Sequence, residues 1–67
     1  MYNAATMDEP RAKFLEVYAN LPSALRDDIV AVVEDKTYTW NAVYTEVVSK
    51  TDLGDKMLSV IEELGII

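Results

Sequence analysis

Carboxylates are the most numerous side chains that could do chemistry in this sequence, and paired carboxylates can bind metal ions or transfer protons. The chain holds twelve acids. They include four adjacent pairs and one pair three residues apart: Asp8/Glu9, Asp27/Asp28, Glu34/Asp35, Glu62/Glu63 and Asp52/Asp55. Adjacent side chains diverge on a helix or a strand, and the ligand spacing of a calcium-binding loop is missing from the sequence. We therefore expect solvated acids and no metal site.

Nucleophiles and general bases are scarce. The 67-residue chain has no histidine and no cysteine, so Ser23, Ser49 and Ser59 have no imidazole to activate them. Its two glycines, Gly54 and Gly65, are too few for a glycine-rich phosphate loop. A chain of this length also leaves little volume for a ligand pocket. The sequence therefore predicts no catalytic residue, no cofactor and no small-molecule substrate, and the protein is not expected to be an enzyme.

Three aromatic residues, Tyr38, Trp40 and Tyr44, lie close together in the sequence. Tyr38 and Trp40 are two positions apart and share a face of a strand, so we expect them mainly to anchor a small core. The alternative is that the three aromatics, alone or together with Tyr18, form a partner-binding patch, because tyrosine and tryptophan are common in interface hot spots. The predicted elements also leave three large apolar residues without a place in the core: Tyr2, Val60 and Ile67. This surplus favours binding to a protein partner or self-association, for example as a homodimer.

The charge of the chain limits its partners. The formal net charge is −6, and the six bases are scattered among the acids: Arg11, Lys13, Arg26, Lys36, Lys50 and Lys56. Nucleic acids and anionic membranes attract clustered basic residues, so neither is an expected partner. The start of the sequence lacks the basic and apolar regions of a signal peptide, and no apolar run approaches the roughly 18 residues of a membrane-spanning helix. We expect a cytoplasmic protein, and the lack of cysteine suits a reducing compartment.

The elements that would position these residues can be read from periodicity and helix breakers. The first helix is expected to start at a cap provided by Thr6 or Asp8 and to end by about Asn20. Its apolar stripe follows helical spacing: Phe14, Val17, Tyr18 and Leu21. Pro22 disfavours helical geometry at the preceding residue. A short helical turn over 23–28 is expected to follow.

A β-hairpin is predicted next, from the segments Ile29–Val33 and Thr37–Trp40. The first segment is dense in β-branched residues, which lose rotamer freedom in a helix. The second alternates polar and aromatic residues, as half-buried strands do. A two-stranded hairpin is marginally stable alone, so it must pack on helices. The alternative is that the whole chain forms an all-helical bundle.

Two registers of this hairpin are compatible with the sequence. A three-residue loop over 34–36 would pair Val32 with Tyr38, whereas a two-residue turn over 35–36 would pair Val33 with Tyr38. The slip by one residue turns the other half of the first strand to the core. Because no glycine marks the turn, both registers remain open.

Two further helices complete the chain. Asn41 is the expected N-cap of a helix over 42–50, and Thr51 or Asp52 is the expected cap of the last helix. The apolar residues of the last helix repeat at helical spacing: Leu53, Met57, Leu58, Ile61 and Leu64. Gly65 is expected to end it in the left-handed conformation that glycine adopts readily.

These elements predict a single small α+β domain over residues 1–67, of order α, short α, β, β, α, α, with residues 1–5 frayed. The most favoured function is a non-catalytic protein–protein interaction module whose candidate partner-binding residues are Tyr38, Trp40 and Tyr44. The first alternative is an acidic mimic of nucleic acid that inhibits a basic partner protein. The second is a structural subunit of an assembly.

Overall fold

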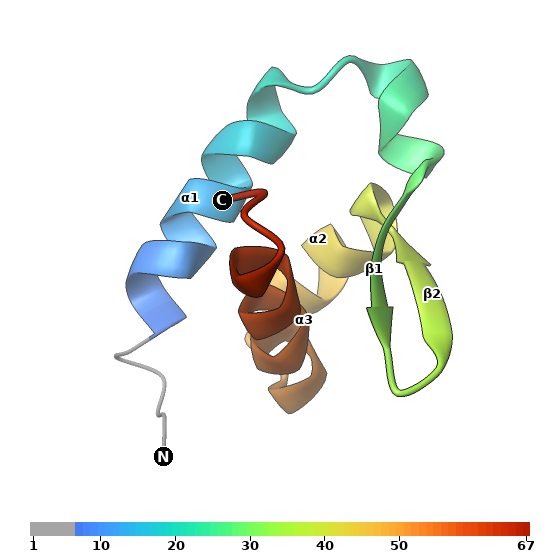
Figure 1. Ribbon diagram of the computed structural model, residues 1–67. Coiled ribbons are helices and arrows are strands. Elements are labelled where there is room, and N and C mark those ends of the chain that lie inside the picture. The colour runs from blue at the N-terminus through green and yellow to red at the C-terminus, as the bar shows by residue number, and fades with distance from the viewer. Residues whose placement is uncertain (1–6) are drawn as a thin grey trace.

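The computed structural model describes residues 7–67 of the chain. Figure 1 shows the elements in chain order: α1 (Asp8–Asn20), the 3-10 helix η2 (Ser23–Asp27), β1 (Ile29–Val33), β2 (Lys36–Thr39), α2 (Trp40–Val48) and α3 (Asp52–Glu63). The two strands pair antiparallel. The predicted α+β class and element order are therefore confirmed, and the alternative of an all-helical bundle is wrong. The expected fraying of residues 1–5 falls outside the described residues.

Helix α1 ends where the sequence predicts. Leu21, which precedes Pro22, is extended with ψ of 132°, so the helix cannot continue through it. The start differs from the prediction, because Met7 occupies the N-cap position without a side-chain hydrogen bond and Asp8 is already the first helical residue. Asp8 still places a negative charge in the first turn, where the helix dipole favours it. Thr6, the other predicted cap, lies outside the described residues.

The hairpin adopts a register that neither predicted alternative contained. The paired residues are Val33 and Lys36, Val32 and Thr37, Ala31 and Tyr38, and Ile29 and Thr39. The turn consists of Glu34 and Asp35, whose φ angles of 53° and 66° both lie in the left-handed region. Two consecutive left-handed residues form a type I′ turn, whose twist matches that of the paired strands. Such turns usually carry glycine or asparagine, and this turn has neither, so the sequence did not predict it.

This register decides which side chains of the hairpin reach the core. Ala31 and Val33 are buried, whereas Val32 between them faces solvent. An irregularity between Ile29 and Ala31 leaves Val30 without a partner on β2, and the side chain of Val30 packs against the core. A bulge of this kind shifts the alternation of side chains along a strand.

Helix α2 begins two residues earlier than predicted, at Trp40. Thr39, the last residue of β2, has extended backbone angles, and its hydroxyl accepts a hydrogen bond from the backbone N–H of Ala42 at 3.1 Å. Thr39 is therefore the N-cap, and the prediction that Asn41 caps this helix is wrong. Strand and helix share this boundary residue without a connecting loop, so the helix starts one residue after the sheet ends.

Helix α3 has the predicted ends. The Thr51 hydroxyl accepts a hydrogen bond from the backbone N–H of Gly54 at 2.9 Å, which makes Thr51 the N-cap. At the other end Gly65 has a φ of 78°, and the N–H of Ile66 donates to the carbonyl of Ile61. This is the Schellman arrangement, in which a left-handed glycine lets the chain turn back on the helix.

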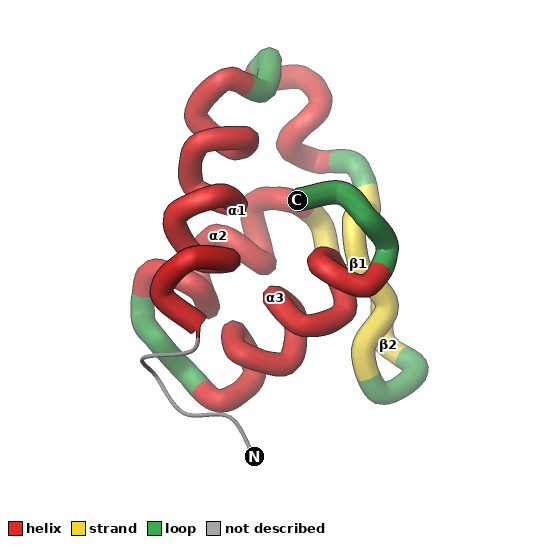
Figure 2. The backbone as a smooth tube through the Cα atoms, turned by 60° about the vertical axis from the view of Figure 1, so that its left-hand side comes forward, coloured by secondary structure: helices red, strands yellow, loops and turns green. Residues whose placement is uncertain are grey.

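The core lies between the three α-helices, with the hairpin packed on α3 and α2 (Figure 2). Its fully buried side chains come from every α-helix: Phe14, Val43, Val47, Met57, Leu58 and Ile61. Val60 and Ile67, which the sequence analysis left without a place in the core, are partly buried against it, so that expectation is wrong. Tyr2 lies outside the described residues. No helix between residues 7 and 67 is long and apolar enough to cross a membrane.

Candidate functional site

Four aromatic rings connect α1 to α2 and form what we call the aromatic stack: Phe14, Tyr18, Trp40 and Tyr44. The rings of Trp40 and Phe14 stack with centroids 5.7 Å apart. Phe14 and Tyr18 follow at 6.2 Å, and Tyr18 and Tyr44 are the closest pair at 4.2 Å, with ring planes 15° apart. The first two separations lie in the range of favourable aromatic contacts and the Tyr18–Tyr44 pair is closer still, so the rings help to hold α1 against α2. The stack runs from the half-buried Trp40 through the buried Phe14 and the half-buried Tyr18 to the exposed Tyr44.

The three candidate partner-binding residues have different surroundings. Trp40 and Tyr38 are half-buried and pack against the core. Tyr44 is 37% exposed and is the most exposed of the three. Trp40 and Tyr44 belong to the same aromatic stack, whereas Tyr38 lies on β2 opposite Ala31 and makes no ring contact with them. The structure therefore brings two of the three residues into one cluster.

A polar network surrounds Tyr18 and ties η2 to both helices. The Tyr18 hydroxyl donates a hydrogen bond to Oδ1 of Asn41 at 2.6 Å, and Nδ2 of Asn41 donates to Asp27 at 3.0 Å. The Arg26 guanidinium lies over the Tyr18 ring, 4.2 Å from its centroid, and donates a hydrogen bond to the Tyr18 carbonyl. The cation–π contact and these hydrogen bonds fix the orientation of Tyr18 and, through it, of Tyr44.

Arg26 and Asn41 are the members of this site that sequence analysis missed. Arg26 lies in a short 3-10 helix whose packing has no periodic signature, and Asn41 resembled a helix cap. The Nε atom of Arg26 is buried and has no hydrogen-bond partner among residues 7–67. A guanidinium that stacks on an aromatic ring often satisfies only some of its donors, so this geometry is compatible with a structural role.

The exposed residues of helix α2 are themselves uncharged, and the Asp27 carboxylate of η2 borders them through its hydrogen bond with Asn41. The solvent-facing residues of the helix are spaced three or four apart: Asn41, Tyr44, Thr45 and Val48. We call these four residues the α2 face. The side chain of Val48 is 51% exposed, so two large apolar groups, one turn apart, lie side by side on it. The exposed residues of α1 and α3 include charges of both signs: Asp8, Glu9, Lys13, Glu16, Asp52, Lys56, Glu62 and Glu63.

A buried ion pair joins α1 to α3. The Arg11 guanidinium donates a hydrogen bond to Asp55 at 2.9 Å, and the two side chains are only 9% and 12% exposed. The Nε of Arg11 also donates to the carbonyl of Val47 at the end of α2. The sequence analysis placed Asp55 among solvated acids, which is wrong for this residue. The missed signal was the position of Arg11, three residues before Phe14 on the apolar side of α1, where a base needs an acidic partner.

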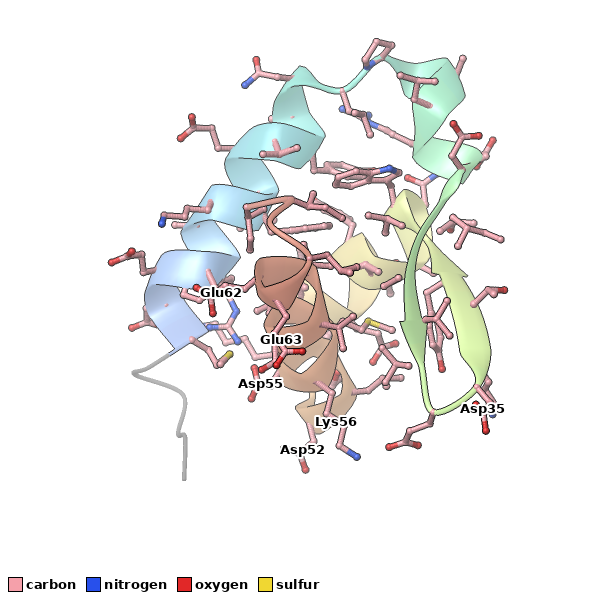
Figure 3. The ribbon with its side chains drawn as sticks, viewed as in Figure 1. Asp35, Asp52, Asp55, Lys56, Glu62 and Glu63 are labelled. Carbon is pink, nitrogen blue, oxygen red and sulfur yellow. The ribbon has the colours of Figure 1, made fainter. Side chains whose placement is uncertain are left out.

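The remaining acids lie apart from one another. In Figure 3, Asp35 at the hairpin turn is far from Asp52 and from the pair Glu62/Glu63. No group of three or more acidic residues between positions 7 and 67 is arranged to hold a metal ion. Glu34 accepts a hydrogen bond from Lys56 at 2.7 Å, and this bond together with the Lys56 charge lowers the pKa of Glu34 below its ordinary value. The described part of the chain also encloses no ligand-sized pocket.

Comparisons with known proteins give no guide to function. No protein family matches the chain. No curated protein and no solved structure matches it either. The function therefore has to be argued from the chain's own geometry, in which the aromatic stack and the α2 face form the most organised exposed region.

Proposed function

We propose that this protein is a non-catalytic protein–protein interaction module. The observation that carries the proposal is the set of large apolar side chains left on the described surface, each between 37% and 62% exposed: Leu25, Ile29, Val32, Tyr44, Val48, Leu64 and Ile66. A chain of 67 residues buries a smaller share of its surface than a larger domain does, so each exposed apolar group is a considerable fraction of what could have stabilised the core. A protein partner would remove these groups from water.

The aromatic stack supports a docking role for Tyr44. Tyrosine, tryptophan and arginine dominate interface hot spots, and Tyr44, Tyr18 and Arg26 lie together where α1, η2 and α2 meet. Because Tyr44 is held by stacking and Tyr18 by hydrogen bonds, a partner would meet an ordered surface and lose little side-chain entropy. In this proposal Tyr44 contacts the partner and Trp40 supports it indirectly, through the Phe14 and Tyr18 rings of the aromatic stack, while Tyr38 packs against the core from β2.

The proposal includes a protein partner rather than nucleic acid, membrane or small molecule, and no enzymatic activity or cofactor. The net charge of −6 opposes association with phosphate backbones and anionic lipids. A chain without histidine or cysteine also lacks the residues most often used for proton transfer and covalent catalysis. A reducing compartment such as the cytoplasm fits this composition.

The alternative function is that of an acidic mimic of nucleic acid, and the observation that favours it is the chain's net charge of −6. Against it, the exposed acids are distributed over several elements, including α1, the hairpin turn and the end of α3. A mimic would need them in a row at phosphate-like spacing. A structural subunit is a special case of the proposed module, because it too acts only by binding other chains.

The experiment that tests the proposal is affinity capture from a nuclease-treated lysate of the source organism, with the tag at the N-terminus. Wild-type protein is compared with folded surface variants, Tyr44→Ala, Val32→Glu and Leu64→Glu, and each capture is washed at low and at high salt. We expect the wild type to capture a protein that stays bound during the high-salt wash. At least one variant should fail to retain that protein. Circular dichroism of each variant shows that the loss is not caused by unfolding.

Two other results would change the conclusion. A captured protein that every variant retains at low salt and that is released at high salt would favour the acidic mimic, since screening weakens exposed charge contacts. If the wild-type chain captures nothing and also remains monomeric at high concentration, the interaction module is refuted.

A further inference from the structure

We propose that residues 22–27, which we call the strap, open as a local unit while the three α-helices stay folded. Arg26 and Asp27 are the residues that keep the strap closed. Figure 1 shows the strap in turquoise and green, in the arch that joins α1 to β1. The inference concerns the movement of one element and does not depend on the proposed interaction function.

The packing of the strap sets it apart from the rest of the fold. No side chain of η2 is buried, and Leu25, its one large apolar residue, is 45% exposed. Each α-helix, by contrast, contributes fully buried side chains to the core. A segment that buries little apolar surface loses little when it leaves the protein. The free energy of opening the strap is therefore well below that of global unfolding.

The two ends of the strap are anchored by backbone hydrogen bonds. Leu21 is extended with ψ of 132°, and its N–H donates to the carbonyl of Tyr18. Asp28 is extended with ψ of 150°, and its carbonyl accepts a hydrogen bond from the N–H of Trp40 at 3.1 Å. Residues at the ends of an element can absorb the changes in backbone angles that a hinge requires. Leu21 and Asp28 are therefore the hinges of the strap.

Two side chains of the strap make the contacts that close it. The Arg26 guanidinium lies 4.2 Å from the centroid of the Tyr18 ring and donates a hydrogen bond to the Tyr18 carbonyl at 3.0 Å. The Asp27 carboxylate accepts a hydrogen bond from Nδ2 of Asn41 on α2, also at 3.0 Å. These contacts are polar and lie at or near the surface, where water competes with them. Each one alone therefore stabilises the closed strap only modestly.

The closed strap also leaves one polar group unsatisfied. Nε of Arg26 is buried and has no hydrogen-bond partner among residues 7–67. Opening the strap returns this donor to water, which satisfies it. The hydrogen bonds inside η2 add to the effect, because 3-10 geometry is poorer than that of an α-helix. Both features bring the open strap closer in free energy to the closed one.

Opening the strap changes the surface beside Tyr44. In the closed strap Arg26 covers part of the Tyr18 ring, and Tyr44 stacks on the same ring with centroids 4.2 Å apart. Withdrawal of the guanidinium uncovers that part of Tyr18 and enlarges the exposed aromatic surface. The strap therefore acts as a gate over the Tyr18 end of the aromatic stack.

Hydrogen exchange of the full chain, measured for each amide by NMR, tests the inference. The amides of Leu25 and Asp28 donate the hydrogen bonds of η2, to the carbonyls of Pro22 and Leu25. The amides of Val47 and Ile61, inside α2 and α3, report global unfolding. We expect the two strap amides to be protected about 100-fold less than these and to share one opening constant within about threefold. Low concentrations of urea should not change that constant, since local opening exposes little surface.

Variants on both sides of the contact identify what keeps the strap closed. Arg26→Met retains an apolar stem but loses the guanidinium, and it should raise the opening constant about tenfold. Asn41→Ala alters α2 rather than the strap and should raise the constant about fivefold, because Asp27 loses its partner. The matched controls are Lys13→Met, which removes an exposed base whose ion pair stays within α1, and Thr45→Ala, which removes a hydroxyl that bonds within α2. Both controls should leave the constant unchanged within about twofold.

Four results would overturn the inference. Strap amides that are as protected as Val47 and Ile61, with the same urea dependence, would show that the strap opens only when the whole chain unfolds. Strap amides without measurable protection would show that it has no closed state in solution. A larger difference between the two opening constants would show separate fraying of single bonds. An opening constant that responds to neither Arg26→Met nor Asn41→Ala would show that these contacts do not keep the strap closed.

The same measurement controls for unfolding of the variants. The amides of Val47 and Ile61 should keep their protection in every variant, and thermal unfolding checks that each chain remains folded. If Arg26→Met does not fold, Asn41→Ala decides the case, since Asn41 is exposed and alanine suits its helical position.

Discussion

At the scale of single residues, the rings of the aromatic stack differ in burial. Trp40 packs against the core, whereas Tyr44 is exposed. Trp40 and Tyr44 lie four positions apart at the start of α2, yet one stacks on the buried Phe14 and the other on the half-buried Tyr18. The difference arises from where each ring points after the helix has docked on α1. Residue type alone predicts the same behaviour for both.

Substitution of these two aromatics should therefore have unequal effects on stability. We expect Trp40→Ala to lower the free energy of unfolding by about 3 kcal/mol, because it leaves a cavity against the core. Tyr44→Ala should lower it by about 1 kcal/mol, since it removes a stacking contact at the surface. Urea unfolding monitored by circular dichroism measures both values. Equal losses would show that Tyr44 is as much a core residue as Trp40.

The ion pair between Glu34 and Lys56 predicts a pH effect of known sign. The hydrogen bond and charge of Lys56 lower the pKa of Glu34 in the folded state. The ion pair therefore stabilises the folded protein at pH values above 4.5, the ordinary pKa of a glutamate side chain. This stabilisation is lost as the pH falls from that value through the lower folded pKa. We expect NMR titration of the Glu34 side chain to show the lowered pKa in the wild type.

The control for this effect is Lys56→Met, which removes the donor and the charge but keeps much of the apolar stem. In that variant the pKa of Glu34 should rise towards 4.5. A Glu34 pKa that does not move in Lys56→Met would show that the contact does not persist in solution. Because both side chains are exposed, we expect little change in overall stability at neutral pH.

At the scale of elements, the hairpin turn is the clearest departure from sequence expectation. Glu34 and Asp35 both adopt left-handed backbone angles that cost most residues free energy and that glycine adopts without penalty. The pairing of the two strands offsets this cost, because a type I′ turn continues their right-handed twist.

Replacing the second turn residue should consequently stabilise the protein. We expect Asp35→Gly to raise the free energy of unfolding by roughly 0.5 kcal/mol or more, because it relieves a left-handed residue while keeping the Glu34–Lys56 contact. Lys36→Gly is the matched control, since Lys36 lies on β2 and glycine weakens a strand. Thermal unfolding of both variants tests the prediction, and destabilisation by Asp35→Gly would contradict this turn type.

The contact between α2 and α3 depends on a glycine. A Cβ atom on Gly54 would lie 2.6 Å from the Glu46 carbonyl oxygen, which is far too close for a backbone atom that cannot move aside alone. Glycine at position 54 therefore permits the close packing of α3 against α2.

We therefore expect Gly54→Ala to destabilise the protein by about 1–3 kcal/mol despite the better helix propensity of alanine, because the two helices must separate. Gly65→Ala is the control, since an added Cβ there meets nothing within 4 Å and only the left-handed φ of 78° opposes it. Chemical unfolding should show a smaller loss, about 1 kcal/mol, for Gly65→Ala. The reverse order would contradict the close approach of the helices.

At the scale of the whole molecule, the buried pair of Arg11 and Asp55 connects parts of the chain that are distant in sequence. Arg11 bonds to Asp55 at the start of α3 and to the carbonyl of Val47 near the end of α2, so one side chain links all three α-helices. In a small domain with a limited core, such a link favours a single arrangement of the helices, because any shift of one helix breaks the hydrogen bonds of Arg11.

Removing one partner of this pair should be costly. We expect Asp55→Ala to lower the free energy of unfolding by about 3 kcal/mol, because it leaves the buried Arg11 guanidinium with only the exposed Asp8 as an acidic partner, at 3.4 Å. The double variant Arg11→Met with Asp55→Leu should recover much of that loss, since apolar groups need no partner. A double-mutant cycle in urea measures the coupling. If Asp55→Ala costs less than about 1 kcal/mol, the pair is worth no more than a surface salt bridge.

The sequence by itself determined the local features of this protein: the α+β element order, the end of α1 before Pro22, the Thr51 cap and the Gly65 terminus. Each depends on residues within a few positions of one another, and their conformational preferences act over that range. The tertiary structure alone decided the hairpin register, the cap of α2, the burial of the Arg11–Asp55 pair and the exposure of Tyr44. These features arise when elements distant in the chain pack together, and packing overrides the weaker local preferences that a sequence displays.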